Sequence, residues 1–205
     1  MRCNTRWIVL LVLVAVGVTG CRTTKVQRLD LRDSRLPVEA RRWLADAEDE
    51  VAIARARLDD AEAGLDELED YRDDLYDRCR EIEQGSHVEA QVTWAEYLTD
   101  AFDDYAFERV LLKKLELEAA QKALDLARAR LTLARAETAV RYDVAVYDLE
   151  PIALEVEALR EDVAYAEREV EEQRAHVERT ATEVWKAYTQ FVGKKGDTHA
   201  LWKTR

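Results

Sequence analysis

The sequence predicts an all-α protein, a long antiparallel coiled-coil hairpin of three helices. Ala, Leu, Glu, Arg and Asp dominate its 205 residues, with only six Gly and two Pro. This composition is typical of long helices, and it leaves too few turn-forming residues to connect many strands. Apolar residues also recur at alternating spacings of three and four, the signature of a coiled coil. The helix-breaking residues divide the pattern into helices at about 38–84, 87–149 and 152–192.

The first 20 residues have the pattern of a secretory signal peptide. Arg2 and Arg6 precede an uncharged run of 12 residues from Trp7 to Val18. A bilayer-spanning helix needs about 20 apolar residues. A positive start, a short apolar core and small residues at its end are typical of a segment that is cleaved off. We therefore expect residues 1–20 to be removed.

Val18-Thr19-Gly20-Cys21 resembles the lipobox of bacterial lipoproteins. This resemblance implies that Cys21 is acylated after cleavage and anchors the chain in a membrane. Several acyl chains anchor firmly, whereas one alone binds only marginally. The residue after the cysteine is Arg22, not the Asp that retains enteric lipoproteins in the inner membrane. The resemblance thus implies the periplasmic face of the outer membrane, with the inner membrane and cell surface as alternatives. An ordinary signal peptide with a chance cysteine is the competing interpretation.

We expect residues 21–36 to form a tether, because they are polar and charged, with the lipid attached at Cys21. A helical domain then spans residues 37–192, with Pro37 in the first turn, where helices tolerate proline. The first helix carries a heptad seam with two alternating sets of positions. These are Leu44, Val51, Leu58, Leu65, Arg72 and Cys79, and Ala47, Ala54, Ala61, Leu68, Leu75 and Ile82. We expect a second helix to pack along this seam.

Gly85 marks the first reversal of the chain. Ser86 and Glu89 have the spacing of a capping box, which predicts that a second helix starts directly after the glycine. Folding about Gly85 places Tyr76 opposite Trp94. The sequence therefore predicts an aromatic cluster near the hairpin tip, in which core packing competes with a binding platform. Trp94 and Tyr97 are the candidate partner contacts there.

The second helix has two apolar faces and so needs two partners. One face carries Leu117, Ala120, Leu124, Ala127, Leu131 and Ala134, and the other carries Leu112, Ala119, Leu126, Leu133 and Val140. The third segment repeats apolar residues every seven positions from Leu149 to Phe191 and supplies a second partner. Near Pro151 two interpretations stay open: the chain folds back at about 142–150, or one long helix merely kinks.

No catalytic constellation is present in the sequence. His87, His176 and His199 are far apart, and none has a second ligand at helical spacing. The acidic runs lack the glycine and ligand order of a calcium loop. We therefore expect no enzyme activity, metal or cofactor. The net charge of −12 also makes nucleic acid an unfavourable partner.

Two further features are candidates for contact with other molecules. Of the three cysteines, Cys3 lies in the signal peptide and Cys21 is the expected lipid site, which leaves Cys79. Cys79 either forms an interchain disulfide in a homo-oligomer or is a small residue buried in the seam. The sequence predicts that residues 193–205 form a flexible basic tail. Its contact candidates for peptidoglycan or a partner protein are Lys194, Lys195, Trp202 and Lys203. A frayed terminus is the alternative.

The body resembles several envelope proteins in architecture alone. These are Braun-type murein lipoproteins, outer-membrane efflux ducts, whose helices are similar to residues 116–137, and periplasmic coiled-coil adaptors and chaperones. The first end in a wall-linking lysine, whereas this chain ends in Arg205. The sequence thus favours a lipid-anchored structural spacer or interaction scaffold in the periplasm. An accessory of an efflux or secretion complex is the first alternative, and a holdase-type chaperone is the second.

Overall fold

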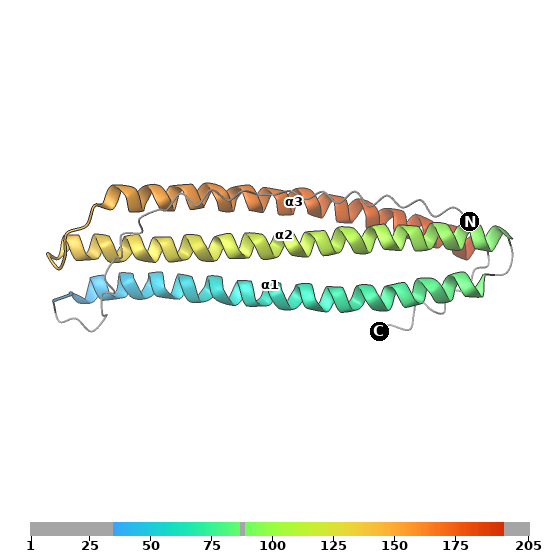
Figure 1. Cartoon of the computed structure of the whole chain (residues 1–205), viewed down its shortest axis with the longest axis horizontal. Coiled ribbons are helices and arrows are strands. Elements are labelled where there is room, and N and C mark those ends of the chain that lie inside the picture. Colours follow the sequence, from blue (N-terminus) through green and yellow to red (C-terminus); the bar gives the residue numbers. More distant parts are fainter. Residues whose placement is uncertain (1–34, 87–88, 195–205) are drawn as a thin grey trace, which may run out of the picture.

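Three long helices make up the computed structural model, which describes residues 35–86 and 89–194. They are α1 (Val38–Gly85), α2 (Glu89–Arg141) and α3 (Leu149–Gly193). Each helix runs antiparallel to the one before it (Figure 1). The predicted all-α fold of three long antiparallel helices is therefore confirmed.

Over most of their length the three helices lie side by side with α2 in the middle, and α3 crosses α2 toward its end at Gly193 (Figure 1). In the described part of the chain α2 contacts both neighbours, whereas the backbones of α1 and α3 do not approach one another. At about 1.5 Å per residue, α2 is roughly 80 Å long. The protein is thus a long, flat rod rather than a closed bundle, and only α2 buries two opposite faces.

The α1–α2 interface uses the predicted seam. Leu58 of α1 is buried against Leu124 and Ala127 of α2, midway along the helices. An ion pair of 2.8 Å between Arg135 Nη2 and Glu48 Oε1 joins the two helices nearby. The alanines on both sides allow the helices to approach closely, since small side chains shorten the distance between helix axes.

Gln173 is a buried polar side chain of the α2–α3 interface. Its amide Nε2 donates a hydrogen bond to the backbone oxygen of Glu108 at 3.1 Å, and a second one to the Glu108 carboxylate. A buried amide is costly unless it is paired. Gln173 occupies a position of the heptad repeat that is otherwise apolar. Its amide is hydrogen-bonded because it faces Glu108. This pair therefore favours one register between α2 and α3.

The second reversal lies at residues 142–148, so the predicted fold-back is confirmed and the alternative, one long helix that kinks near Pro151, is wrong. The predicted boundaries at 149 and 152 also shift, because α2 already ends at Arg141. Asp143 takes a left-handed backbone with φ of 52°, which stops the helix without a glycine. The backbone N–H of Val144 donates to the Ala139 oxygen at 2.8 Å. The Asp148 carboxylate then accepts from the Glu150 N–H at 3.3 Å and caps α3.

The register predicted for α1 and α2 is wrong. Thr99 Oγ1 donates to Glu83 Oε1 at 3.0 Å, and Tyr76 lies beside Asp103 rather than Trp94. The first turns of α2 extend past the end of α1 (Figure 1), so a fold centred on Gly85 misplaces each pair. The Ser86 hydroxyl, predicted to cap α2, instead donates to the Ile82 oxygen of α1 at 2.9 Å. Residues 87–88 lie outside the described part.

The rod has two distinct ends. The loop end consists of Arg35, the start of α1 and residues 142–148, and the aromatic end consists of the end of α1, the start of α2 and the end of α3. Three antiparallel helices are an odd number, which places Arg35 and Lys194 at opposite ends. None of the described helices is both long enough and apolar enough to cross a membrane.

Candidate functional site

The aromatic end is held together by a small core that joins all three helices. Ile82 of α1, Leu98 of α2 and Phe191 of α3 are all buried there, together with Ala95, Ala101 and Ala187. The rings of Trp94, Phe102 and Tyr188 pack against this core. The core fixes the backbone positions of α2 and α3, so the side chains on its outer surface are held by rigid elements.

Two pairs of aromatic rings lie on the outside of this core. Trp94 and Tyr97 of α2 meet edge to face with centroids 5.6 Å apart and an interplanar angle of 71°. Trp185 and Tyr188 of α3 stack with centroids 5.6 Å apart at 23°. Trp185 remains 64% exposed and Tyr97 39% exposed. Exposed aromatic residues on a rigid surface are typical of protein contacts, because they bury a large area on binding.

Lys186 and Lys194 lie at the same end of the rod as these rings. The Lys186 ammonium donates to the Glu183 carboxylate at 2.5 Å, and this hydrogen bond raises the pKa of Lys186. The backbone oxygen of Lys194 accepts from Gln91 Nε2 at 3.4 Å, which holds the end of α3 beside the start of α2. The two contact regions predicted separately, the hairpin tip and the start of the basic tail, therefore lie at the same end.

Not every candidate residue could be placed. Trp94, Tyr97 and Lys194 come together at the aromatic end, whereas Cys21, Lys195, Trp202 and Lys203 lie outside the described residues. Sequence reasoning missed Trp185 and Tyr188. Val184 belongs to the heptad seam, and Trp185 is the next residue and lies outside that seam. This position could have indicated that Trp185 is exposed. Its proximity to α2 depends on the reversal at 142–148.

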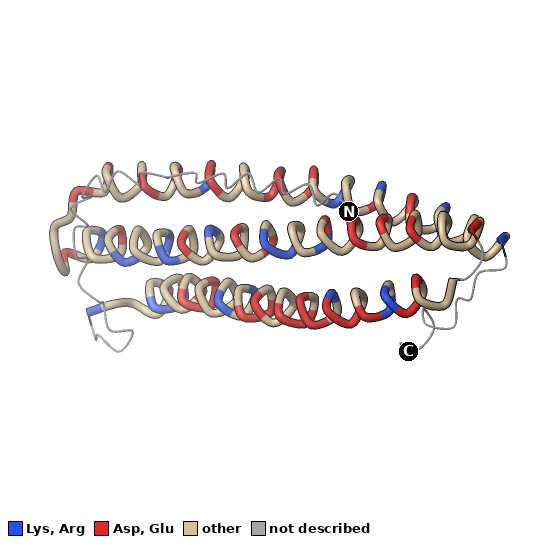
Figure 2. The backbone as a smooth tube through the Cα atoms, turned by 45° about the vertical axis from the view of Figure 1, so that its right-hand side comes forward, with Lys and Arg blue, Asp and Glu red and all other residues tan. Residues whose placement is uncertain are grey.

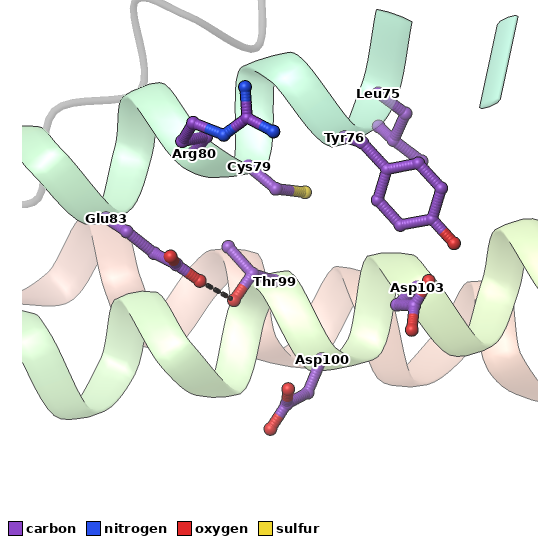
Figure 3. Close-up of a pocket in the computed structure, with 8 residues that line it drawn as sticks. All are labelled: Leu75, Tyr76, Cys79, Arg80, Glu83, Thr99, Asp100 and Asp103. Carbon is purple, nitrogen blue, oxygen red and sulfur yellow. Dashed lines mark hydrogen bonds between the residues drawn. The ribbon is translucent and has the colours of Figure 1, made fainter. Parts of the chain in front are cut away.

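A hollow of about 450 Å³ lies between α1 and α2 near Cys79 (Figure 3). The Cys79 sulfur points from α1 toward α2, and Thr99 lies across from it. The hollow is open to solvent along one side of the rod. Its lining residues are Leu75, Tyr76, Cys79, Arg80, Glu83, Thr99, Asp100 and Asp103.

The surroundings of Cys79 disfavour its thiolate form. Burial, followed by the nearby carboxylates of Glu83 and Asp103, raises the pKa of Cys79 to about 11. A hydrogen bond to Asp103 raises the pKa of Tyr76 in the same hollow. Because the thiolate is the nucleophile and the metal ligand, Cys79 is poorly suited to either role at neutral pH. An interchain disulfide at Cys79 stays a prediction, and its formation from the folded chain would be slow.

Carboxylates follow α1 along most of its length (Figure 2). Several pair with arginines on the same helix, such as Arg55 Nε with Asp59 Oδ1 at 3.0 Å and Arg80 Nη1 with Asp77 Oδ1 at 3.1 Å. In the described part of the chain, no group of three or more His, Cys, Asp or Glu side chains is arranged to hold a metal ion. These carboxylates therefore form a solvated, negatively charged face.

The aromatic end is the strongest candidate site, because it combines exposed rings, a rigid core and the start of the basic tail. Only the chain's own residues support this assignment. No family model, curated protein or solved structure matches the chain.

Proposed function

We propose that this protein is a lipid-anchored spacer of the bacterial cell envelope, which presents its aromatic end to an envelope partner. Cys21 would be the membrane anchor, and the periplasmic face of the outer membrane its location. The observation that supports this most is the opposite placement of Arg35 and Lys194. The tether leaves one end of the rod, and the exposed aromatic rings lie at the other.

The shape of the rod suits the separation of two contacts. At about 1.5 Å per residue, helices of this length hold their ends roughly 70–80 Å apart. Each helix is braced along its length by α2 or by both neighbours. A partner bound at the aromatic end would thus be kept at a defined distance from the membrane.

The anchor is tested by replacing Cys21 with Ala in cells that export the protein. We expect C21A to carry no acyl chains and to keep its signal peptide, because the lipoprotein peptidase acts only on the acylated cysteine. Cys79→Ala is the matched control and should be acylated and cleaved like the wild type. Mass spectrometry that finds C21A acylated, or cleaved before residue 21 like the wild type, would contradict the anchor.

The contact is tested by crosslinking in intact cells followed by mass spectrometry. Trp185→Ala combined with Tyr97→Ala should remove the principal crosslinked partner while helicity by circular dichroism stays unchanged. Tyr165→Ala is the matched control, because this exposed tyrosine lies on α3 away from both ends. An identical crosslinking pattern for all three proteins would show that the aromatic end is not the contact.

A second candidate function is that of an accessory docking onto an efflux or secretion complex. It uses the same aromatic end, and the exposed Trp185 of α3 at that end favours it. Crosslinks to subunits of an inner-membrane pump or secretion channel would support this function. Peptidoglycan is the other contact predicted for the tail. Sedimentation with purified peptidoglycan that is unchanged by deletion of residues 193–205 would exclude the tail from that contact.

A further inference from the structure

The loop end carries exposed apolar side chains on all three helices and on the loop itself. Val146 of the loop is 97% exposed, and Leu154 of α3 is 64% exposed. Trp43 and Val38 of α1 and Val140 of α2 are also exposed. The loop is not loosely attached, since Tyr142, Val144, Ala145 and Tyr147 pack onto the core beneath it. Val146 is thus held outward by its packed neighbours.

The exposed side chains on the helices lie close to the helix ends. Trp43 is five residues after the first residue of α1, and Leu154 is five residues after the first of α3. At 1.5 Å per residue both lie about 8 Å along the axis from the helix ends. Apolar groups of interfacial segments insert about 5–10 Å into the headgroup and acyl boundary. Measured from the ends of their own helices, Val38, Trp43, Val140 and Leu154 fall within that depth, and Val146 lies on the loop beyond the helices.

The charge of the loop end differs from the rest of the rod. The described chain is strongly acidic (Figure 2), and a surface of that charge is repelled by anionic headgroups. Residues 35–43 and 136–154 contain four arginines and five carboxylates. These are Arg35, Arg41, Arg42 and Arg141, against Glu39, Glu137, Asp143, Asp148 and Glu150. The loop end is therefore a nearly neutral part of the rod that approaches a bilayer with little of this repulsion.

The chain that precedes the described residues enters the rod at this same end. Cys21 is 14 residues before Arg35. A fully extended chain covers at most about 3.6 Å per residue, so the reach of this segment is about 50 Å or less. That reach is shorter than the rod, and it keeps the loop end, rather than the aromatic end, next to the site of the anchor.

We propose that the loop end docks onto the phospholipid bilayer through Val146, Leu154, Trp43, Val38 and Val140, and so holds the rod upright on the membrane. This inference rests on the proposed anchoring at Cys21 and adds a second, non-covalent contact with the same bilayer. Partial insertion of the exposed side chains fixes the direction of the rod, which a polar tether alone leaves free.

The experiment uses the purified, processed lipoprotein in phosphatidylcholine vesicles, with and without bromine on the acyl chains. One variant retains Trp43 alone, with Trp94, Trp185 and Trp202 changed to Phe. Its matched control retains Trp185 alone. We expect the Trp43 emission to lose intensity in brominated vesicles and the Trp185 emission to stay unchanged. Circular dichroism of both variants checks that the fold is retained.

Two outcomes distinguish this inference from the anchor itself. If the lipoprotein floats with the vesicles but Trp43 is not quenched, docking of the loop end is wrong while the anchor stands, and a protein or second copy covers this surface instead. If the lipoprotein does not float, both proposals fail. Val146→Asp with Leu154→Asp should abolish the quenching of Trp43, whereas Val192→Asp at the opposite end should not. Quenching that persists in V146D/L154D would also overturn the docking.

Discussion

The thiol of Cys79 lies in the seam between α1 and α2, where burial and two carboxylates oppose its ionisation. We expect Cys79 in the folded protein to react with iodoacetamide much more slowly at neutral pH than in urea. The rate should rise with pH toward a pKa of about 11, because only the thiolate reacts. Mass spectrometry of the Cys79 peptide measures the rate. Equal rates in the folded and unfolded chain would contradict this environment.

Arg109 of α2 contacts tyrosine rings on both α1 and α2. Its guanidinium lies 5.4 Å from the ring centroid of Tyr71 on α1 and 5.5 Å from that of Tyr105 on α2. Cation–π contacts contribute about 0.5–2 kcal/mol, depending on how far they are desolvated. We expect Arg109→Ala to lower the free energy of unfolding in urea by about 1–2 kcal/mol, since two rings are lost as partners.

Arg128→Ala is the control for this prediction. Arg128 contacts Asp125 on the same helix at 3.4 Å, and both side chains are well exposed. Exposed pairs of this kind contribute roughly 0–1 kcal/mol. If R109A were no more destabilising than R128A, the two tyrosine contacts would not stabilise the α1–α2 interface.

At the scale of the helices, the predicted seams and most of the predicted boundaries agree with the structure, whereas the predicted end of α2 at 149 does not. Heptad positions such as Leu58 and Leu124 are set by burial along a whole helix, which repeats every seven residues and is readable from sequence. The reversal after α2 depends on a single residue. Asp143 adopts a left-handed conformation that is usually given to Gly or Asn, so no strong sequence signal marks it.

This reversal gives a prediction at residue 143. Asp143→Val should lower the free energy of unfolding by about 1–2 kcal/mol, because a β-branched side chain is strained at positive φ. Asp143→Gly should stay within about 1 kcal/mol of the wild type, since glycine is unstrained there but adds freedom to the unfolded chain. Thermal or urea unfolding of the two variants measures the difference. A valine variant as stable as the glycine variant would show that the backbone at 143 is not strained.

For the whole molecule, the central position of α2 divides the stability into two interfaces. Leu58 is buried between α1 and α2, and Leu58→Ala should cost about 2–5 kcal/mol. Because the backbones of α1 and α3 do not approach one another in the described chain, and Leu58 lies far from the core shared by all three helices, the loss should be local. Amide hydrogen exchange should rise in α1 and stay near the wild-type level in α3.

Val170→Ala is the corresponding variant for the other interface, because Val170 is buried between α2 and α3. It should raise exchange in α3 and leave α1 near the wild-type level. A uniform increase over all three helices in either variant would show that the rod unfolds as a single cooperative unit.

The candidate site could be predicted only in part at this scale. Trp94 and Tyr97 were identifiable because aromatic residues near a turn indicate a contact surface. Their neighbours were not, since the approach of Trp185 depends on the second reversal and on an α2 that extends past α1. Tyr76 was predicted to join the cluster because the fold was assumed to be centred on Gly85, whereas it lies beside Asp103. Long helices turn a small error in a turn into a displacement of whole helical turns.

The opposite placement of Arg35 and Lys194 also determines how the rod responds to tension between its two ends. A force that pulls these ends apart acts parallel to the helix axes. It draws α1 one way along α2 and α3 the other way, so the side chains of each interface must slide past one another together. Peeling would break the same contacts one after another at a lower force. The fold is therefore mechanically strongest in the direction in which a spacer between two layers of the envelope is stretched.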